Sequence, residues 1–294
     1  KTPSAVALGY FDGVHLGHRA VINAACDYAK KENLCSGVFT FTFNGEASKK
    51  GFSIMPLKQR EERIEKLGVD EYICLSFCDI KELSPEEFVK DFLQEKLCAK
   101  AVFCGNNYRF GKNAAGDIEL LKTLCAKANI KVFVVEMAQY KNELISSTVI
   151  KTALTQGEIE KANAMLGMPY EINFEVVHGK AFGRTLGFPT INQPYPENIL
   201  IPKNGVYITK TFINGKWYPS ATGIGNRPTV GGENVSCETF IVDFNGDLYG
   251  DAPRVQFCKY FAPTVKFDSV DELKAYINNA ASAAKKSFLQ EKEI

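Results

Sequence analysis

The chain has 294 residues, of which 45% are hydrophobic and 23% are charged, and its formal net charge is +1. This is the composition of an ordinary globular protein that is long enough for two domains. The balanced charge gives no general attraction to nucleic acid or anionic membranes, and no apolar run approaches the roughly 18 residues that cross a bilayer. We therefore expect no nucleic-acid or membrane partner, and the sequence leaves the oligomeric state open.

The amino-terminal stretch KTPSAVALGYF has neither the charged start nor the apolar segment of a secretory signal. It also lacks an initiator methionine, which indicates a missing or processed natural terminus. Nine cysteines are scattered along the chain without any CxxC pair, and most of them fall inside apolar stretches. Free thiols in a reducing cytoplasm explain this pattern better than disulfides or a zinc site. The expected location is the cytoplasm.

The first half of the chain alternates short β-branched runs with helical segments. Strands are expected at 4–10, 35–43, 70–75, 99–105 and 130–136, and helices at 18–33, 57–68, 84–97 and 116–129. The third helix opens on Ser84, Pro85 and Glu87, which predict a capping box. This alternation predicts an α/β domain with a Rossmann-like parallel sheet. Ligands of such sheets bind beyond the carboxyl ends of the strands.

After about residue 168, strands follow one another without helices between them. They are expected at 173–179, 205–212, 216–225, 237–244 and 255–263. Asn-Gly pairs at 214–215 and 245–246 lie between apolar runs and predict tight hairpins. The segment 223–232 is expected to be a flexible loop. This half should form an antiparallel β-barrel with a terminal helix at 271–292, and two short helical segments at 147–157 and 158–167 lead to the join.

The stretch GYFDGVHLGH, at residues 9–18, holds two of the three histidines in the protein, His15 and His18. It lies between a predicted strand and a predicted helix, and its three glycines allow close backbone approach. The unpaired N–H groups of a helix start suit phosphate, and both imidazoles can donate hydrogen bonds to phosphate oxygens. The pattern favours a phosphate site, with a capping and a packing histidine as the alternative.

The same stretch carries the HxGH signature of nucleotidyltransferases. Its full length resembles the opening motif of the prokaryotic bifunctional riboflavin kinase/FAD synthetase family. Two later segments, CGNNYRFGKNAAGD at 104–117 and ISSTVIK at 145–151, resemble the second and third adenylyltransferase motifs of that family. The resemblance implies an FMN adenylyltransferase domain over residues 1–168.

By this resemblance, His15 and His18 bind the triphosphate of ATP and stabilise charge at the α-phosphorus. The other ATP and phosphate contacts that it implies are Gly9, Phe11, Asp12, Gly17, Ser146 and Thr148. For the flavin it implies Asn107, Arg109 and Phe110, with the Phe110 ring against the isoalloxazine. From the residues alone, Asn107 could equally be a turn residue, Phe110 a core ring and the SST run a helix cap.

Two departures from the family pattern bear on the adenylyltransferase half. The proline-rich stretch that usually follows the second strand is absent from FTFNGEASKK, at 41–50, and Lys151 stands where the third motif has arginine. Lysine keeps the positive charge but loses the bidentate fork of a guanidinium. A monofunctional riboflavin kinase with a weakened adenylyltransferase half is therefore an open alternative.

The second half contains HGKAFGRTLGFPTIN, at 178–192. From GKAFGR alone, a barrel turn without ligand is as good an explanation as a phosphate site, and no P-loop pattern occurs anywhere. The whole string resembles the riboflavin kinase motif GRxLGFPTxN of the same family. The resemblance implies that Gly179 and Gly183 contact ATP phosphates and that Thr190 and Asn192 coordinate Mg²⁺.

Glu238 lies in an otherwise apolar predicted strand and matches the family's catalytic glutamate. A carboxylate in such a strand needs a partner or a purpose. As general base it would take the proton from the ribityl 5′-hydroxyl of riboflavin. The alternation of the strand also allows a solvated residue on its polar face. Asn226 and Arg227 are weaker candidates on the 223–232 segment.

Together the motifs predict a bifunctional cytoplasmic enzyme with riboflavin, FMN and ATP as its small-molecule partners. Residues 169–294 would phosphorylate riboflavin to FMN, and residues 1–168 would convert FMN to FAD and release pyrophosphate. Besides the monofunctional kinase, two alternatives stay open. One is a nucleotidyltransferase that makes a coenzyme A precursor, and the other is a non-catalytic flavin- or nucleotide-binding protein.

Overall fold

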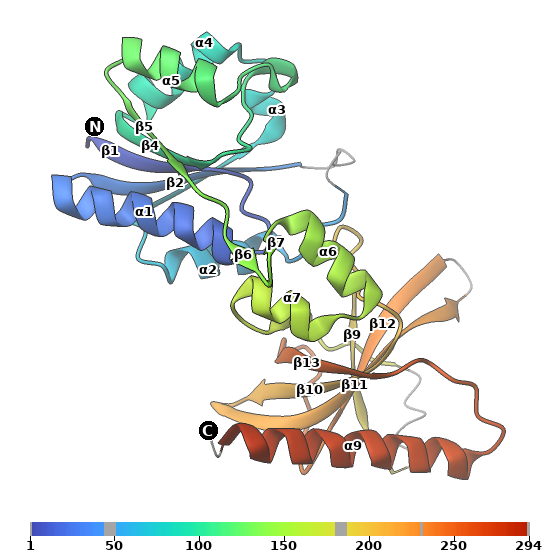
Figure 1. Cartoon of the computed structure of the whole chain (residues 1–294). Helices are drawn as coiled ribbons and strands as arrows, with labels where there is room; N and C mark the ends of the chain where they lie inside the picture. Colours follow the sequence, from blue (N-terminus) through green and yellow to red (C-terminus); the bar gives the residue numbers. More distant parts are fainter. Residues whose placement is uncertain (1, 44–50, 180–186, 230–231, 293–294) are drawn as a thin grey trace. The chain divides into compact units, whose positions relative to one another are not determined.

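The computed structural model describes residues 2–43, 51–179, 187–229 and 232–292. The chain divides into two compact units, Lys1–Ser147 and Thr148–Ile294 (Figure 1). No helix within these described ranges is long and apolar enough to cross a membrane.

Unit 1 is built on a parallel five-stranded sheet, as the alternating sequence predicted. Its strands are β1 (Ser4–Leu8), β2 (Cys35–Thr42), β3 (Glu71–Ser76), β4 (Ala99–Gly105) and β5 (Lys131–Val135), in the order β3-β2-β1-β4-β5. The chain therefore moves outward from β1 to β3 and returns to the other side of β1 with β4. This reversal creates a crevice beyond the carboxyl ends of β1 and β4, where such sheets bind their ligands.

Helices cover both faces of this sheet (Figure 1). They are α1 (Leu16–Glu32), α2 (Leu57–Glu65), α3 (Phe77–Ile80), α4 (Pro85–Glu87), the π-helix η1 (Phe88–Lys96), the 3-10 turn η2 (Lys112–Ala114) and α5 (Ile118–Lys127), followed by the short strands β6 (Gln139–Tyr140) and β7 (Glu143–Leu144). The predicted capping box is confirmed, because Ser84 Oγ accepts from Glu87 N at 3.2 Å and the Glu87 carboxylate accepts from Ser84 N at 2.7 Å.

Unit 2 is an antiparallel six-stranded sheet with helices around it. Its elements are α6 (Ser147–Gln156), α7 (Ile159–Leu166), β8 (Tyr170–Ile172), β9 (Thr190–Pro194), β10 (Gly205–Ile213), β11 (Lys216–Thr229), β12 (Gly232–Ile241), β13 (Arg254–Ala262) and α9 (Val270–Lys292). The strand order is β8-β13-β10-β11-β12-β9. A hydrogen bond of 2.9 Å from Val177 N to Asn192 O joins the segment after β8 to β9 and helps the sheet curl into the predicted barrel.

Helix α7 is tied to the sheet of unit 2. The Asn163 side chain accepts from Tyr170 N at 2.7 Å and donates to Phe257 O at 2.8 Å. The sequence placed α6 and α7 in a first domain that ends at residue 168. That functional division of the chain stays a prediction.

A ladder of buried hydroxyl groups runs across the inner face of β10, β11 and β12. Its members are Thr209, Thr211, Ser220, Thr222 and Thr239, each at most 2% exposed. Neighbouring oxygens along the ladder lie 2.8–2.9 Å apart. Because every member has a partner, the polar groups are buried without the cost of an unmade hydrogen bond, and the ladder fixes how these strands pair.

The Asn-Gly pair at 214–215 forms the predicted tight hairpin, with Ile213 paired to Lys216 and positive φ at both turn residues. The prediction for the pair at 245–246 is wrong. Strand β12 ends at Ile241, and the next strand begins only at Arg254. Phe244 and Leu248 instead pack into a small core cluster, so apolar burial decides the path of this segment.

Two further expectations for unit 2 are wrong. Residues 173–179 form no strand, because the pairing of β8 with β13 ends at Ile172. The segment 223–232, expected as a flexible loop, continues the hairpin of β11 and β12 with paired residues from Gly223 to Thr229. Pairing between these two consecutive strands extends the hairpin despite its glycines and proline.

Candidate active sites

The histidine-bearing stretch lies at the crevice of the unit 1 sheet. It follows β1 directly and leads into α1, and the second motif follows the neighbouring strand β4. The third motif is attached to the first, since Ser147 Oγ donates to Asp12 O at 2.9 Å. The fold therefore joins the first and third motifs, which are more than a hundred residues apart in the sequence.

The turn before α1 is strained. Phe11 and Val14 have φ of 54° and 44°, in the left-handed region that side chains rarely adopt, and the β-branched Val14 is the more unusual of the two. A side chain at Gly9 would meet the Phe11 ring at 2.8 Å, which explains the glycine there. Asp12 is 1% exposed, and its carboxylate accepts from Ile54 N at 2.9 Å. These contacts hold a high-energy backbone directly before the two histidines.

His15 and His18 form one stacked unit at the start of α1. Their rings are 3.5 Å apart between centroids with 20° between the planes, and His18 also meets the Phe11 ring edge-on. His15 caps the helix, because its Nδ1 accepts from His18 N at 3.3 Å. A neutral His15 therefore carries its proton on Nε2, which leaves that atom as a hydrogen-bond donor.

His15 is uncharged at neutral pH. Burial, and next to it the positive charge of Arg19, lower the pKa of His15 from 6.5 to about 4. Arg19 donates from Nε to Val14 O at 3.0 Å, and one of its terminal nitrogens is enclosed without a hydrogen-bond partner in the described part of the chain. The sequence motif identified the imidazoles but not Arg19, which supplies the fixed positive charge beside them.

The depressed pKa of His15 predicts acid sensitivity of unit 1. In the unfolded chain His15 becomes protonated below pH 6.5, whereas in the folded chain it becomes protonated only near pH 4. The free energy of unfolding of unit 1 therefore keeps its full value above pH 6.5 and decreases as the pH falls, by about 3 kcal/mol once pH 4 is reached. His15→Gln should reduce this loss in urea unfolding curves, and His178→Gln, a change at an exposed histidine, should leave it in place.

The one tryptophan, Trp217, lies in β11 and reports unit 2. Unfolding of unit 1 should therefore appear as the part of the circular dichroism transition that tryptophan fluorescence does not follow. If wild type and His15→Gln lost the same free energy of unfolding in acid, His15 would not be the group responsible for the acid sensitivity.

The remaining residues expected in the first site differ in how far they are buried. Asn107, Arg109 and Thr148 are exposed, and Ser146 and Lys151 are half-buried. Arg109 lies 3.9 Å from the Asp117 carboxylate, which caps α5. Phe110 is only 5% exposed and packs against Phe88 and Tyr108. Its expected contact with a flavin ring stays a prediction.

The second candidate site lies on β9 and β12 of unit 2. Pairing of these strands places Glu238 opposite Asn192 and Phe240 opposite Thr190. Residues two apart share a face, so all four side chains belong to the same side of the sheet. The Asn192 Oδ1 atom is buried and has no hydrogen-bond partner in the described ranges. Gly179 is exposed, and Gly183 lies outside the described residues.

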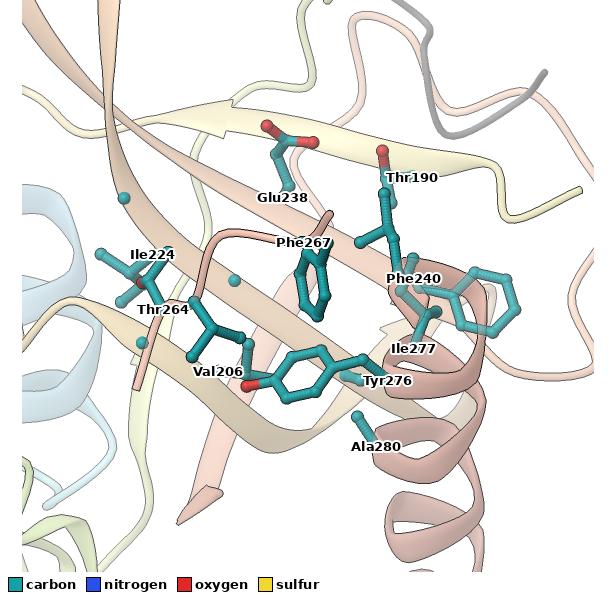
Figure 2. Close-up of a pocket in the computed structure, with 16 residues that line it drawn as sticks. Thr190, Val206, Ile224, Glu238, Phe240, Thr264, Phe267, Tyr276, Ile277 and Ala280 are labelled. Atoms are coloured by element: carbon teal, nitrogen blue, oxygen red, sulfur yellow. The ribbon is translucent and has the colours of Figure 1, made fainter. Parts of the chain in front are cut away.

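A cavity of about 340 Å³ opens beside these residues (Figure 2). Glu238 and Thr190 lie at one end, and Tyr276, Ile277 and Ala280 of α9 lie at the other. Between them the walls are almost entirely apolar and include Phe240, Phe267, Val206 and Ile224. Sequence reasoning missed Phe240, Phe267 and Tyr276. The helical spacing of Leu273, Tyr276, Ile277 and Ala280 was a signal that one face of α9 meets the sheet.

The described residues contain no cluster of three or more His, Cys, Asp or Glu side chains that could hold a metal ion. All nine cysteines are free. Burial raises the pKa of Cys104 to about 11 and that of Cys125 and Cys237 to about 12, so these thiols are protonated and unreactive.

A histidine-bearing helix start on a parallel sheet, and in the other unit an apolar cavity that ends at a carboxylate, are what a transferase with two separate sites needs. Residues 1–149 match the family model described as FAD synthetase, and residues 166–288 match the one described as riboflavin kinase. The chain belongs to the family of bifunctional riboflavin kinase/FMN adenylyltransferases and has both of its domains.

Two relatives with that name show the extent of the similarity. The protein from Listeria monocytogenes is 37% identical over 92% of this chain and 88% of its own length. The protein from Bacillus subtilis is 34% identical over 98% of this chain and 93% of its own length. A crystal structure named as a macrolide-efflux protein from Streptococcus pneumoniae has a TM-score of 0.86 and 30% identity, and the match covers 96% of this chain and 94% of that one. It shares the fold of both units.

Proposed function

We propose that the cavity of unit 2 is the riboflavin kinase site and that the crevice of unit 1 is the FMN adenylyltransferase site. Residues 169–294 would carry the first reaction and residues 1–168 the second. The observation that supports the kinase assignment is that Glu238, at the polar end of an apolar cavity, is paired with Asn192 on the neighbouring strand. Nine free cysteines without a disulfide are consistent with work in a reducing cytoplasm.

In the kinase site, the flat isoalloxazine ring would enter the apolar cavity and the ribityl chain would extend toward Glu238. The Glu238 carboxylate accepts the proton of the 5′-hydroxyl while that oxygen attacks the γ-phosphorus of ATP, and ADP leaves. Glu238 is half-buried and lines the cavity beside mostly apolar residues.

Thr190 and Asn192 would hold the Mg²⁺ that accompanies ATP. The fit rests on Asn192 Oδ1, a buried oxygen without a partner in the described ranges, and on the hydroxyl of Thr190 on the same face. Neutral oxygen donors suit a hard cation that keeps several waters. When bound, Mg²⁺ would neutralise charge on the ATP phosphates.

Asn192→Leu tests this assignment. The variant keeps a side chain of similar size but lacks the oxygen, so the Mg²⁺ concentration that gives half-maximal FMN formation should rise at least about tenfold. The Mg²⁺ dependence of FMN adenylylation in the same protein is the internal control and should not move. An unchanged Mg²⁺ requirement for FMN formation would remove Asn192 from the metal site.

In the adenylyltransferase site, a phosphate oxygen of FMN would attack the α-phosphorus of ATP, and pyrophosphate would leave. His15 donates from Nε2, His18 lies against it, and Arg19 adds positive charge beside them. Preorganised donors of this kind stabilise the charge that develops in the transition state. Gly9, Phe11, Asp12, Gly17, Ser146 and Thr148 would complete the nucleotide contacts, and Asn107, Arg109 and Phe110 those with the flavin.

A time course tests the whole proposal. The full chain is incubated with riboflavin, ATP and Mg²⁺, and the flavins are separated by chromatography. FMN that appears first and then gives way to FAD supports two working sites. FMN that accumulates without FAD would show that the adenylyltransferase half is inactive, which is the monofunctional alternative that the sequence left open.

A further inference from the structure

The cavity of unit 2 has two chemically different ends (Figure 2). Glu238 and Thr190 supply oxygen atoms at one end, and Tyr276 closes the other with an aromatic ring beside Ile277 and Ala280. A volume of about 340 Å³ lies near the lower limit for small-ligand pockets.

Tyr276 is held in place from three directions. Its hydroxyl donates to Pro263 O at 3.0 Å. Its ring packs against Phe267 at 5.1 Å and Phe261 at 6.3 Å between centroids. Its backbone belongs to α9, which packs against β10 and β11 through Ala280 and other buried small residues. A ring fixed by a hydrogen bond and two aromatic contacts cannot swing aside for a longer ligand without losing them.

The isoalloxazine ring system has one polar edge, which carries carbonyl and N–H groups, and one apolar edge, which carries two methyl groups. Because Tyr276, Ile277 and Ala280 form an apolar end, the dimethyl edge is the one that can be buried there without unpaired polar groups. The polar edge then takes the open side of the cavity.

We propose that Tyr276 determines the substrate specificity of the kinase by limiting the length of the ring system at its dimethyl edge. The inference rests on the proposed riboflavin site and adds a positioning and selecting residue that the sequence motifs do not contain. Tyr276 touches the non-reacting end of the substrate, so it selects between flavins through fit and takes no part in proton transfer.

The experiment compares two substrates in the full chain. One is riboflavin, and the other is an analogue in which a cyclopentylamino group replaces the C8 methyl. Wild type should disfavour the analogue strongly, because one extra methylene in an apolar pocket already costs about 10- to 200-fold in kcat/KM. In Tyr276→Ala the ratio of kcat/KM for the analogue to that for riboflavin should rise at least about tenfold.

Two variants separate the ring from its hydroxyl group and from general loss of structure. Tyr276→Phe keeps the ring and removes only the bond to Pro263, so its substrate ratio should stay that of wild type. Tyr249→Ala removes an exposed tyrosine outside the cavity and should leave kcat/KM for both substrates unchanged. If Tyr276→Ala unfolds, Tyr276→Leu shortens the side chain with less loss of packing and should shift the ratio in the same direction.

An unchanged ratio in a folded Tyr276→Ala or Tyr276→Leu variant that still phosphorylates riboflavin would overturn the inference. The proposed site itself would stand in that case. If instead Glu238→Gln phosphorylates riboflavin normally in the same assay, the site assignment fails first, and the two failures are thereby distinguished.

Discussion

Glu238→Gln is expected to lower kcat for FMN formation by about 10²- to 10⁴-fold, because an amide cannot accept the hydroxyl proton that the carboxylate takes. The substitution keeps the size of the side chain at the polar end of the cavity, so riboflavin binding should persist. Conversion of added FMN to FAD should be unaffected, since that reaction is assigned to unit 1. Chromatography of flavins from parallel reactions with riboflavin and with FMN measures both effects.

Glu171→Gln provides a matched control within the same unit. Glu171 lies on β8, where its carboxylate accepts from Gln256 at 2.8 Å, and it does not line the cavity. The same chemical change there should leave FMN formation near the wild-type rate. If Glu238→Gln lost both activities together while remaining folded, the division of labour between the two units would be wrong.

Local signals in the sequence predicted the elements whose geometry is itself local. The capping box at Ser84 and the hairpin at Asn214–Gly215 depend on residues within a few positions of each other, and both are confirmed. The Asn245–Gly246 turn carried the same signal, and its hairpin does not form. There the distant residues Val176 and Ile213 gather Phe244 and Leu248 into a common cluster, and tertiary burial outweighs turn preference.

The candidate sites likewise depend on contacts between distant residues, which local sequence signals do not predict. Motifs named Glu238 and Asn192 separately, but the register that sets them opposite each other depends on strand pairing across more than forty residues. A shift of one residue would turn Glu238 to the other face of the sheet. Phe267 and Tyr276 belong to a loop and a helix that only the folded chain brings to the cavity. The neutral state of His15 likewise follows from burial, which no motif reports.

His18→Ala is expected to lower kcat for FAD formation from FMN by about 10²- to 10³-fold, the effect of removing one preorganised donor from a developing charge. His18 is the better target of the stacked pair. His15 caps α1 and is 4% exposed, so its replacement also disturbs the fold, whereas His18 is half-buried and its own helix contact comes from its backbone N–H. The rate of FAD formation at saturating ATP measures the change.

FMN formation from riboflavin in the same preparation is the internal standard for this variant, and His178→Ala is the matched control. His178 stacks on Tyr249 at 3.7 Å in unit 2, so its loss should spare FAD synthesis. If His18→Ala raised KM for ATP without lowering kcat, the imidazole would bind ground state and transition state equally. The developing charge would then be stabilised by His15 Nε2 and by Arg19, and Arg19→Gln would be expected to show the large loss in kcat instead.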